Sequence, residues 1–288
     1  MISHILRYRK LLWDLVAMGR KPQGQNKVLA AKLGLYPEHI EGKLYKVQGF
    51  DMYLTTMEHI QRVLIEQGAY EWAETSLLPK FVKRGSIAVN VGANVGYYSL
   101  LLSRLVGHRG HIYAFEPLPI NFERLKINID INVDNVTPYN LALGDAPKIS
   151  RYKFNPSING GIPNFGGFSM VGTESEDGNI VIETITLDDF VQQRAIQDIR
   201  FLKIDVEGFE SQVLNGARAT VQRFRPTIMV EYLAMLKTGT DQNVREIQRF
   251  MDSMGYTVCR VHKKPRLHIE PVVSEDFEMP IQFNAICY

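Results

Sequence analysis

Hydrophobic residues follow two repeating patterns through most of this chain. From Ile87 onward, short apolar runs of strand length alternate with longer segments whose apolar residues recur at helical spacing. The predicted strands are residues 87–91, 111–116, 136–143, 201–206, 227–232, 257–262 and 282–288. The predicted helices are residues 97–106, 121–132, 209–224 and 244–255. This alternation predicts an α/β fold with a doubly wound sheet, in which parallel strands are joined by crossover helices.

The beginning of the chain is patterned differently. Residues 1–20 place apolar side chains among basic ones at the spacing of an amphipathic helix, and residues 21–50 contain Gly and Pro with little periodicity. Helical patterns return at residues 57–67 and 71–83. We therefore expect an N-terminal helical extension or linker over residues 1–56 and one main domain over residues 57–288. A basic amphipathic helix can dock on its own domain, form a homodimer contact or lie on a membrane surface, and the first two are our expectation for residues 1–20.

Composition and charge narrow the function classes. The 288 residues are 45% hydrophobic and 22% charged, with a net charge of only +2, so no broad basic surface for nucleic acid is expected. No apolar run has the length of about 20 residues that a membrane span needs. The two cysteines, Cys259 and Cys287, form no metal-ligand spacing and no disulfide framework, which suits a cytoplasmic protein. The histidines His262 and His268 read as surface residues, and no metal site is predicted.

The end of the first predicted strand carries the clearest candidate site. The sequence VNVGANVGYYS places Gly92 and Gly96 between that strand and the following helix. Glycines there permit a tight turn and a close approach of ligand to backbone, and the helix offers free N–H groups. Glu116 ends the second predicted strand, at about the 20-residue separation at which a carboxylate binds a ribose diol. Turn and carboxylate together predict a site for a ribose-containing ligand at the carboxyl edge of the sheet.

The identity of that ligand depends on Asn94. A dinucleotide turn has glycine at this place, whereas Asn94 crowds a pyrophosphate but can bond a small polar group. A nucleoside with an amino-acid tail, S-adenosylmethionine, fits better than a nicotinamide cofactor. A turn in which the glycines serve the backbone alone is the remaining alternative.

A family resemblance rests on several segments in order. VNVGANVGYYS, AFEPLPINFERLKINI, NLALGD, ITLDDF, FLKIDVEGFESQVLNGA and RPTIMVEY together resemble the FkbM family of S-adenosylmethionine-dependent methyltransferases, from about Gly68 to Tyr232. The resemblance implies a class I methyltransferase fold, Rossmann-like, with a seven-stranded sheet whose last strand is antiparallel. It also implies that Asp145, in NLALGD, lies in the adenine pocket. One departure is Asn90, where the family has an aspartate that helps to hold the amino-acid part of the cofactor.

Candidate residues for the reaction follow later strands. Asp205 and Glu207 lie two residues apart at a predicted strand end, and Glu231 ends the next strand. Extended backbone directs Asp205 and Glu207 to the same side, and neighbouring carboxylates raise one another's pKa, which suits proton transfer. The alternatives are that Asp205 only orients the cofactor and that Glu207 caps a helix. We expect Lys203 to pair with a carboxylate inside the sheet.

A long glycine-rich segment, residues 155–179, reads as a lid over the site. Its Phe165 and Phe168 either stack on a sugar or pack beneath the loop. The sequence as a whole predicts a methyltransferase that uses S-adenosylmethionine to methylate a hydroxyl on a sugar, a polysaccharide or a glycosylated natural product, with a small-molecule or saccharide acceptor. Rival hypotheses are N-methylation of a related amine, a non-catalytic S-adenosylmethionine-binding module and a nicotinamide oxidoreductase.

Overall fold

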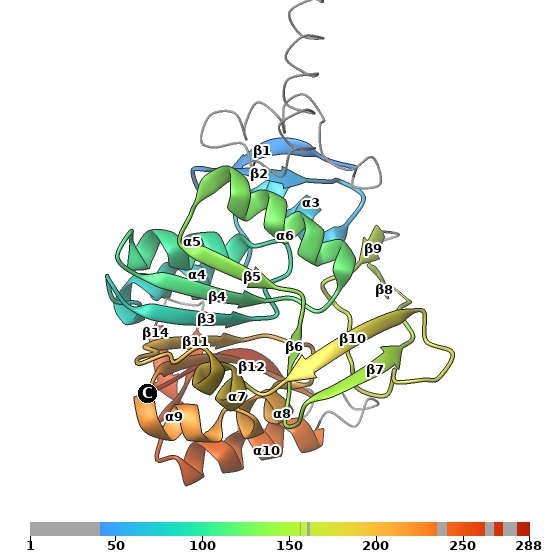
Figure 1. The fold of residues 1–288 in the computed structure, drawn as a ribbon. Helices are drawn as coiled ribbons and strands as arrows, with labels where there is room; N and C mark the ends of the chain where they lie inside the picture. The colour runs from blue at the N-terminus through green and yellow to red at the C-terminus, as the bar shows by residue number, and fades with distance from the viewer. Residues whose placement is uncertain (1–40, 156, 160–161, 235–240, 263–267, 273–280) are drawn as a thin grey trace, which may run out of the picture.

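The computed structural model describes residues 41–155, 157–159, 162–234, 241–262, 268–272 and 281–288. Its centre is a sheet of eight strands in the order β14-β13-β15-β12-β11-β3-β4-β5 (Figure 1). The strands are β3 (Ile87–Val91), β4 (His111–Phe115), β5 (Val136–Tyr139), β11 (Phe201–Ile204), β12 (Thr227–Ala234), β13 (Val258–His262), β14 (His268–Pro271) and β15 (Ile281–Cys287). Strand β15 pairs antiparallel with both β12 and β13, whereas the neighbours from β5 to β12 pair in parallel. The predicted doubly wound sheet with an antiparallel last strand is confirmed, and β14 adds an eighth strand at one edge.

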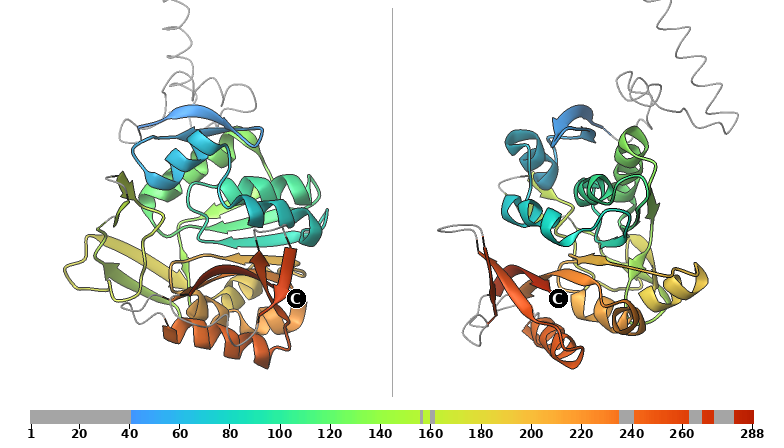
Figure 2. Two further views of the ribbon diagram at one scale, coloured as in Figure 1. Left: turned by 180° about the vertical axis from the view of Figure 1, so that it is seen from behind. Right: turned by 90° about the vertical axis from the view of Figure 1, so that its left-hand side faces the viewer.

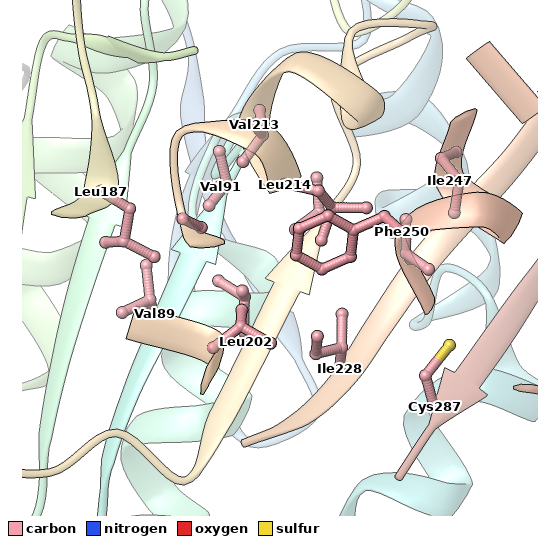
Figure 3. Close-up of a cluster of buried hydrophobic side chains, with 14 of the residues drawn as sticks. Val89, Val91, Leu187, Leu202, Val213, Leu214, Ile228, Ile247, Phe250 and Cys287 are labelled. Carbon is pink, nitrogen blue, oxygen red and sulfur yellow. The ribbon is translucent and has the colours of Figure 1, made fainter. Parts of the chain in front are cut away.

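Helices cover both faces of this sheet because its strand residues alternate in direction. Val89 and Val91 pack with the helices α7 (Leu187–Gln193), α8 (Glu210–Asn215), α9 (Arg218–Phe224) and α10 (Asp241–Ser253). Ala88, which precedes Val89 and points to the opposite side, packs on the other face with α3 (His59–Gln67), α4 (Trp72–Phe81), α5 (Tyr97–Val106) and α6 (Pro119–Asn132). Figure 2 shows the two helical layers, and Figure 3 shows the interior of the first, where Leu202 and Ile228 meet Phe250.

Two predicted elements are divided in the structure. The run 136–143 leaves the main sheet after Tyr139, and Ala142–Leu143 form β6 of a smaller sheet with β10 (Ile180–Ile185) and β7 (Lys148–Tyr152). The predicted helix 209–224 breaks at Gly216, where an added Cβ would stand 1.9 Å from the carbonyl oxygen of Gly144. Position 216 thus has no room for a side chain, and the second helix begins where Asp188 accepts the N–H groups of Ala219 and Thr220.

The end of the expected N-terminal extension is a β-hairpin. Strands β1 (Lys43–Val47) and β2 (Phe50–Leu54) pair antiparallel, and the backbone N–H of Tyr53 donates to Asn128 Oδ1 on α6 at 2.6 Å. A second small hairpin, β8 (Ser157–Asn159) with β9 (Ile162–Asn164), lies within the segment predicted as a lid. Residues 1–40, including the predicted amphipathic helix 1–20, are outside the described residues.

Membrane insertion finds no support in the described ranges. None of the helices in this part of the chain combines the length and the apolar character that crossing a bilayer requires.

Candidate functional site

A pocket lies at the carboxyl edge of the sheet, where the ends of β3, β4, β11 and β12 meet the start of α4 and the loop after β9. Six predicted site residues line it: Gly92, Asn94, Glu116, Asp205, Glu207 and Glu231. Binding of ligands outside the carboxyl ends of strands is the rule for doubly wound sheets. The structure therefore brings together, at one cavity, predicted residues from strands that are up to three positions apart in the sheet.

The glycine turn is tight because two strand ends touch. Gly92 has φ +78°, and a Cβ on it would lie 1.8 Å from the carbonyl oxygen of Asp205. The N–H groups of Gly92 and Ala93 both donate to the carbonyl of Phe115, at 3.0 and 2.9 Å. The turn after β3 is thus fixed between β11 on one side and β4 on the other, and only glycine fits at its first position.

Glu116 is held at the pocket wall by backbone donors. The N–H of Asn94 donates to its Oε2 at 2.8 Å, and the N–H of Leu118 donates to its Oε1 at 3.0 Å. Burial raises the pKa of Glu116 to about 7, although these two donors act in the opposite direction. A carboxylate fixed in this way has lone pairs left for two hydroxyl groups, which is what a ribose diol presents.

Asn94 adds an unused polar atom to the same wall. It has φ +48°, a conformation that asparagine tolerates better than most residues. Its Oδ1 is buried and finds no hydrogen-bond partner among the described residues. A buried polar atom without a partner calls for an explanation, and a polar ligand in the pocket provides one.

Three predicted site residues lie away from the pocket wall. Asn90 is fully buried between the sheet and α5, where its Nδ2 donates to Ser99 Oγ at 2.9 Å. Gly96 faces α6, since a Cβ on it would meet Leu125 Cδ1 at 2.9 Å. Asp145 is exposed beyond β6, and the neighbouring Leu141, Ala142 and Leu143 line the pocket instead. Asn90 therefore makes an internal contact and not a pocket contact, and the expected contribution of Asp145 to the pocket is not found.

Lys203 organises the reacting end of the pocket. Its Nζ lies 2.7 Å from Asp205 Oδ2, which confirms the predicted internal ion pair, and 4.2 Å from the centre of the Tyr98 ring. Burial lowers the pKa of Lys203, but the charges of Asp205 and Glu71 outweigh it and keep the pKa above its usual range. Lys203 is therefore a permanent ammonium group, and Asp205 is its fixed partner.

Glu71 is a site residue that the sequence reasoning missed. Its Oε2 accepts from Tyr98 OH at 2.7 Å, its Oε1 accepts from Asn284 Nδ2 at 2.8 Å, and it lines the pocket. Burial and the charge of Asp205 raise its pKa. The available signal was the segment GAYEWAE, which belongs to the family resemblance and also supplies Tyr70 to the pocket wall.

Glu207 lines the pocket, and a second acid stabilises the turn that precedes α8. Glu210 Oε1 accepts the N–H groups of Val206 and Gly208, at 3.0 and 3.2 Å. Burial, and then repulsion from Asp205, Glu210 and Glu71, raise the pKa of Glu207 to about 8. The helix-cap alternative for Glu207 is wrong, because the N-cap of α8 is Phe209 and no side chain caps this helix.

Glu231 has the most unusual environment of the predicted acids. Burial, followed by repulsion from Asp205 and Glu207, raises its pKa well above the usual range. Its Oε1 receives a 3.4 Å contact from Gln282 Nε2, whereas its buried Oε2 has no hydrogen-bond partner within the part of the chain that the structure describes. An uncommitted carboxyl oxygen in a pocket is suited to accept a proton or a hydrogen bond from a ligand.

Backbone strain is concentrated at this pocket. Six non-glycine residues have positive φ in the described ranges, and three of them, Glu71, Asn94 and Glu207, line the pocket. Such conformations cost about 1–3 kcal/mol each and cluster at sites where geometry has a function. The strained backbone supports a binding site here. The sequence predicted two of these three residues, Asn94 and Glu207, but not Glu71.

The predicted lid segment contributes to the pocket at its outer side. Phe165, Gly166 and Phe168 are among the lining residues. The N–H of Phe165 donates to Glu58 Oε1 at 3.1 Å, and a Cβ on Gly166 would lie 2.6 Å from Asn94 Nδ2. Loop, helix α3 and glycine turn therefore pack together, and the rings of Phe165 and Phe168, which line the pocket, also pack against Phe154 with centroid distances of 5.8 and 5.6 Å.

A histidine cluster lies on the hairpin of β13 and β14. Ligand atoms of His262, His268 and Glu270 all lie within 4.8 Å of one another. His268 Nε2 lies 2.9 Å from Glu270 Oε1, and the two imidazole rings stack at 5.1 Å. Hydrogen bonding and stacking within the hairpin account for this contact. None of the three residues is part of the pocket wall.

The fold and site define a class of protein. A parallel sheet completed by an antiparallel strand, with a glycine turn and a buried carboxylate at neighbouring strand ends, is the arrangement of a class I methyltransferase. The chain belongs to the FkbM methyltransferase family, because the family described as "Methyltransferase FkbM domain" matches residues 90–258, more than half of its length. Methyltransferases of this family use S-adenosylmethionine.

Individual relatives are similar over part of their length. Hexuronic acid methyltransferase AglP of Haloferax volcanii is 30% identical over 146 residues, which cover 51% of this chain and 56% of that protein. The 31-O-demethyl-FK506 methyltransferase FkbM of Streptomyces tacrolimicus is 28% identical over 201 residues, 62% of this chain and 75% of that protein. The chain spans little more than half the length of AglP and, at 58%, of Methyltransferase 1 of Beauveria bassiana.

Two solved structures are similar at low identity. A methyltransferase FkbM from Methylobacillus flagellatus is 16% identical with a TM-score of 0.44, over 71% of this chain and 44% of that one. Fibrillarin of Aeropyrum pernix, solved with bound S-adenosylmethionine, is 16% identical with a TM-score of 0.43, over 88% of this chain and 84% of that one.

Proposed function

We propose that this chain is an S-adenosylmethionine-dependent methyltransferase that methylates a hydroxyl on a sugar, a polysaccharide or a glycosylated natural product. The observation that carries the proposal is the division of the pocket into two ends. The glycine turn and Glu116 lie at one end, and the acids that follow β11 and β12 lie at the other. The first end suits a nucleoside, and the second suits an acceptor and its proton.

The residues at the first end fit the cofactor. Glu116 would accept the two ribose hydroxyls, and the exposed backbone after Gly92 would contact the amino-acid part. The apolar surface of Leu141 and Leu143, together with Phe209 from the other side, would hold the adenine ring. The unpartnered Oδ1 of Asn94 would accept one further donor from the ligand.

When bound, S-adenosylmethionine supplies a methyl group on a sulfonium, which a nucleophile displaces in line. The protein contributes position and proton transfer. Asp205 is committed to Lys203 at 2.7 Å, which fixes its carboxylate as an orienting group. Glu231, with an unpartnered Oε2 and a raised pKa, would take the acceptor hydroxyl proton once its own carboxyl is ionised.

The relatives support a hydroxyl-rich acceptor without fixing it. The name of AglP states a hexuronic acid as its substrate, and the name of the Streptomyces protein states 31-O-demethyl-FK506. Both names describe those proteins. For this chain, the acceptor class is part of the proposal, with Phe165 and Phe168 as candidate surfaces for stacking on a sugar.

The test is transfer of a labelled methyl group. The purified protein would be incubated with methyl-labelled S-adenosylmethionine and a panel of glycosides and polysaccharides, and both labelled product and S-adenosylhomocysteine would be measured. We expect label on a hydroxyl oxygen, with Glu116→Gln reducing transfer at low cofactor concentration and the surface variant Glu123→Gln leaving it unchanged. Label on a nitrogen would favour N-methylation, and tight cofactor binding with no transfer to any acceptor would favour the non-catalytic module.

A further inference from the structure

The charges that line the pocket are unbalanced. Its described wall carries five acids, Glu71, Glu116, Asp205, Glu207 and Glu231. Lys203 is the one basic residue among the described lining residues. A cleft lined by one sign of charge concentrates ligands of the opposite sign and discourages those of the same sign. The excess of acids therefore favours positively charged ligands in this pocket.

The acids are not evenly distributed. Glu116 stands at the end of β4, three strands away from Glu231 on β12 in the order β4-β3-β11-β12. At the usual strand spacing this is about 14 Å, which separates a ribose contact from the other end of the pocket. Asp205, Glu207, Glu231 and Glu71 gather around Lys203 at that other end, since each influences the pKa of at least one of the others.

One of these acids, Glu231, has a carboxyl oxygen without a hydrogen-bond partner among the described residues. Glu231 is 8% exposed, lines the pocket and has a buried Oε2 that no described residue bonds. Leaving a buried carboxyl oxygen unsatisfied costs about 1–3 kcal/mol. A donor from a bound molecule would remove that penalty, so the geometry indicates a ligand group next to Glu231.

The cofactor does not balance the charge. S-adenosylmethionine has a sulfonium, an ammonium and a carboxylate, and thus one net positive charge. Together with Lys203 it balances two acids, whereas four stand at this end. A pKa of about 8 keeps Glu207 protonated at neutral pH, and burial with repulsion from Asp205 and Glu207 raises the pKa of Glu231 well above its usual range. A further cation bound at this end would lower both pKa values and allow Glu207 and Glu231 to ionise against it.

We infer that the acceptor carries a protonated amine beside the hydroxyl that is methylated, as in an amino sugar, and that anionic sugars such as uronates are excluded. This rests on the proposed function, because it assigns the second end of the pocket to the acceptor. The ammonium lies between Glu207 and Glu231, and the neighbouring hydroxyl faces both the methyl donor and the second carboxyl oxygen of Glu231, which takes its proton. The site then differs from that of a relative named for a hexuronic acid, although the two chains share the family fold.

The experiment compares three acceptors that differ only in charge. Methyl glucoside, methyl 2-amino-2-deoxyglucoside and methyl glucuronoside would be titrated calorimetrically into the protein saturated with sinefungin, a cationic analogue that cannot transfer a methyl group. We expect the amino glycoside to bind about tenfold more tightly than the neutral one, as one added favourable charge contact implies, and the uronoside not to bind. Raising the salt concentration should reduce the preference only modestly, because the acids are buried.

Variants and product analysis separate this inference from the proposed function. Glu231→Gln should remove most of the preference for the amino glycoside, whereas Glu123→Gln, an equal change of charge on the outer surface of α6, should leave it intact. Uronoside binding equal to that of the neutral glycoside, or no advantage for the amino glycoside, would overturn the inference. Binding is measured without turnover, so absence of methyl transfer would overturn the proposed function alone. Methylation of the amine instead of the hydroxyl would overturn both, because it would place the amine and not the hydroxyl at the methyl donor.

Discussion

Replacing Gly92 by alanine tests the architecture of the pocket at its narrowest point. The added Cβ would lie 1.8 Å from the carbonyl oxygen of Asp205 and 2.9 Å from its carbonyl carbon. Both are backbone atoms, which cannot swing away as a flexible side chain can. The end of β3 and the end of β11 must therefore separate by at least about 1 Å to restore an ordinary contact distance.

The magnitude follows from what this separation breaks. Alanine in a left-handed conformation costs about 1–2 kcal/mol. The N–H of Asp205 donates to the carbonyl of Val91 at 3.1 Å, and loss of that bond adds about 1 kcal/mol. Displacement of a packed core adds about 1–3 kcal/mol. The total is about 4 kcal/mol, or a fall in Tm of about 10 °C for a domain of this size.

Gly85→Ala is the matched control. Gly85 has φ +77°, close to that of Gly92, but a Cβ on it would have nothing within 4 Å. We expect this variant to lose only about 1 kcal/mol, from backbone strain alone. Thermal unfolding followed by circular dichroism, with titration of S-adenosylmethionine, would compare the two. Equal losses of stability, with cofactor binding kept by Gly92→Ala, would refute the reasoning that the contact between β3 and β11 shapes the pocket.

Three further predictions follow from the pocket acids. Glu116→Gln should weaken S-adenosylmethionine at least about tenfold by calorimetry, because an amide satisfies fewer of the backbone and ribose donors, and unchanged affinity would exclude the ribose contact. Glu231→Gln should lower kcat about 100-fold with little change in cofactor affinity, whereas Asp205→Asn should reduce both together, and the reverse pattern would make Asp205 the base. The third concerns pH: Glu116 and Glu207 have pKa values raised to about 7 and about 8 in the folded protein, so the folded state holds more protons than the unfolded state above their ordinary pKa of 4.5. The stability that these protons contribute is complete below the ordinary pKa and is lost as pH rises through the raised values. The unfolding free energy of the cofactor-free protein should therefore fall by about 3 kcal/mol or more between about pH 5 and pH 9, and a flat profile by urea denaturation would contradict the raised pKa values.

The alternation of side-chain directions along β3 predicts which face of the sheet Asn90 occupies, which the family motif does not. Val89 and Val91 face α7 to α10, so Asn90 must face the opposite helical layer, where it bonds Ser99. A residue two places before a glycine turn can belong to a family motif and still be directed away from the ligand. Strand periodicity, applied to Asn90, would have placed it correctly.

Contacts between distant segments could not be read from local pattern. Glu71 meets Asn284 across 213 positions and joins Asp205 at the pocket only through the packing of α4 on the sheet. The division of the predicted helix 209–224 likewise involves Asp188, which lies on α7 and accepts the N–H groups of Ala219 and Thr220. The strands, the turn and Glu116 were predictable because each depends on its own neighbours, and the parallel sheet then brings their carboxyl ends together.

The turn before α8 shows how two similar acids divide their roles. Glu207 and Glu210 lie close together in the sequence, and either could face the pocket. Glu207, with a positive φ of +55°, lines the pocket, whereas Glu210 accepts the N–H groups of Val206 and Gly208 within the turn. Only the three-dimensional course of the turn after β11 decides between them.

The central claim, that this pocket binds S-adenosylmethionine, is tested most directly by isothermal titration of the purified protein with that cofactor and, separately, with NAD. We predict micromolar binding of S-adenosylmethionine, weakened by Glu116→Gln, and no binding of NAD. Binding of NAD in preference, or binding of S-adenosylmethionine that is unaffected by both Glu116→Gln and Gly92→Ala, would contradict the account.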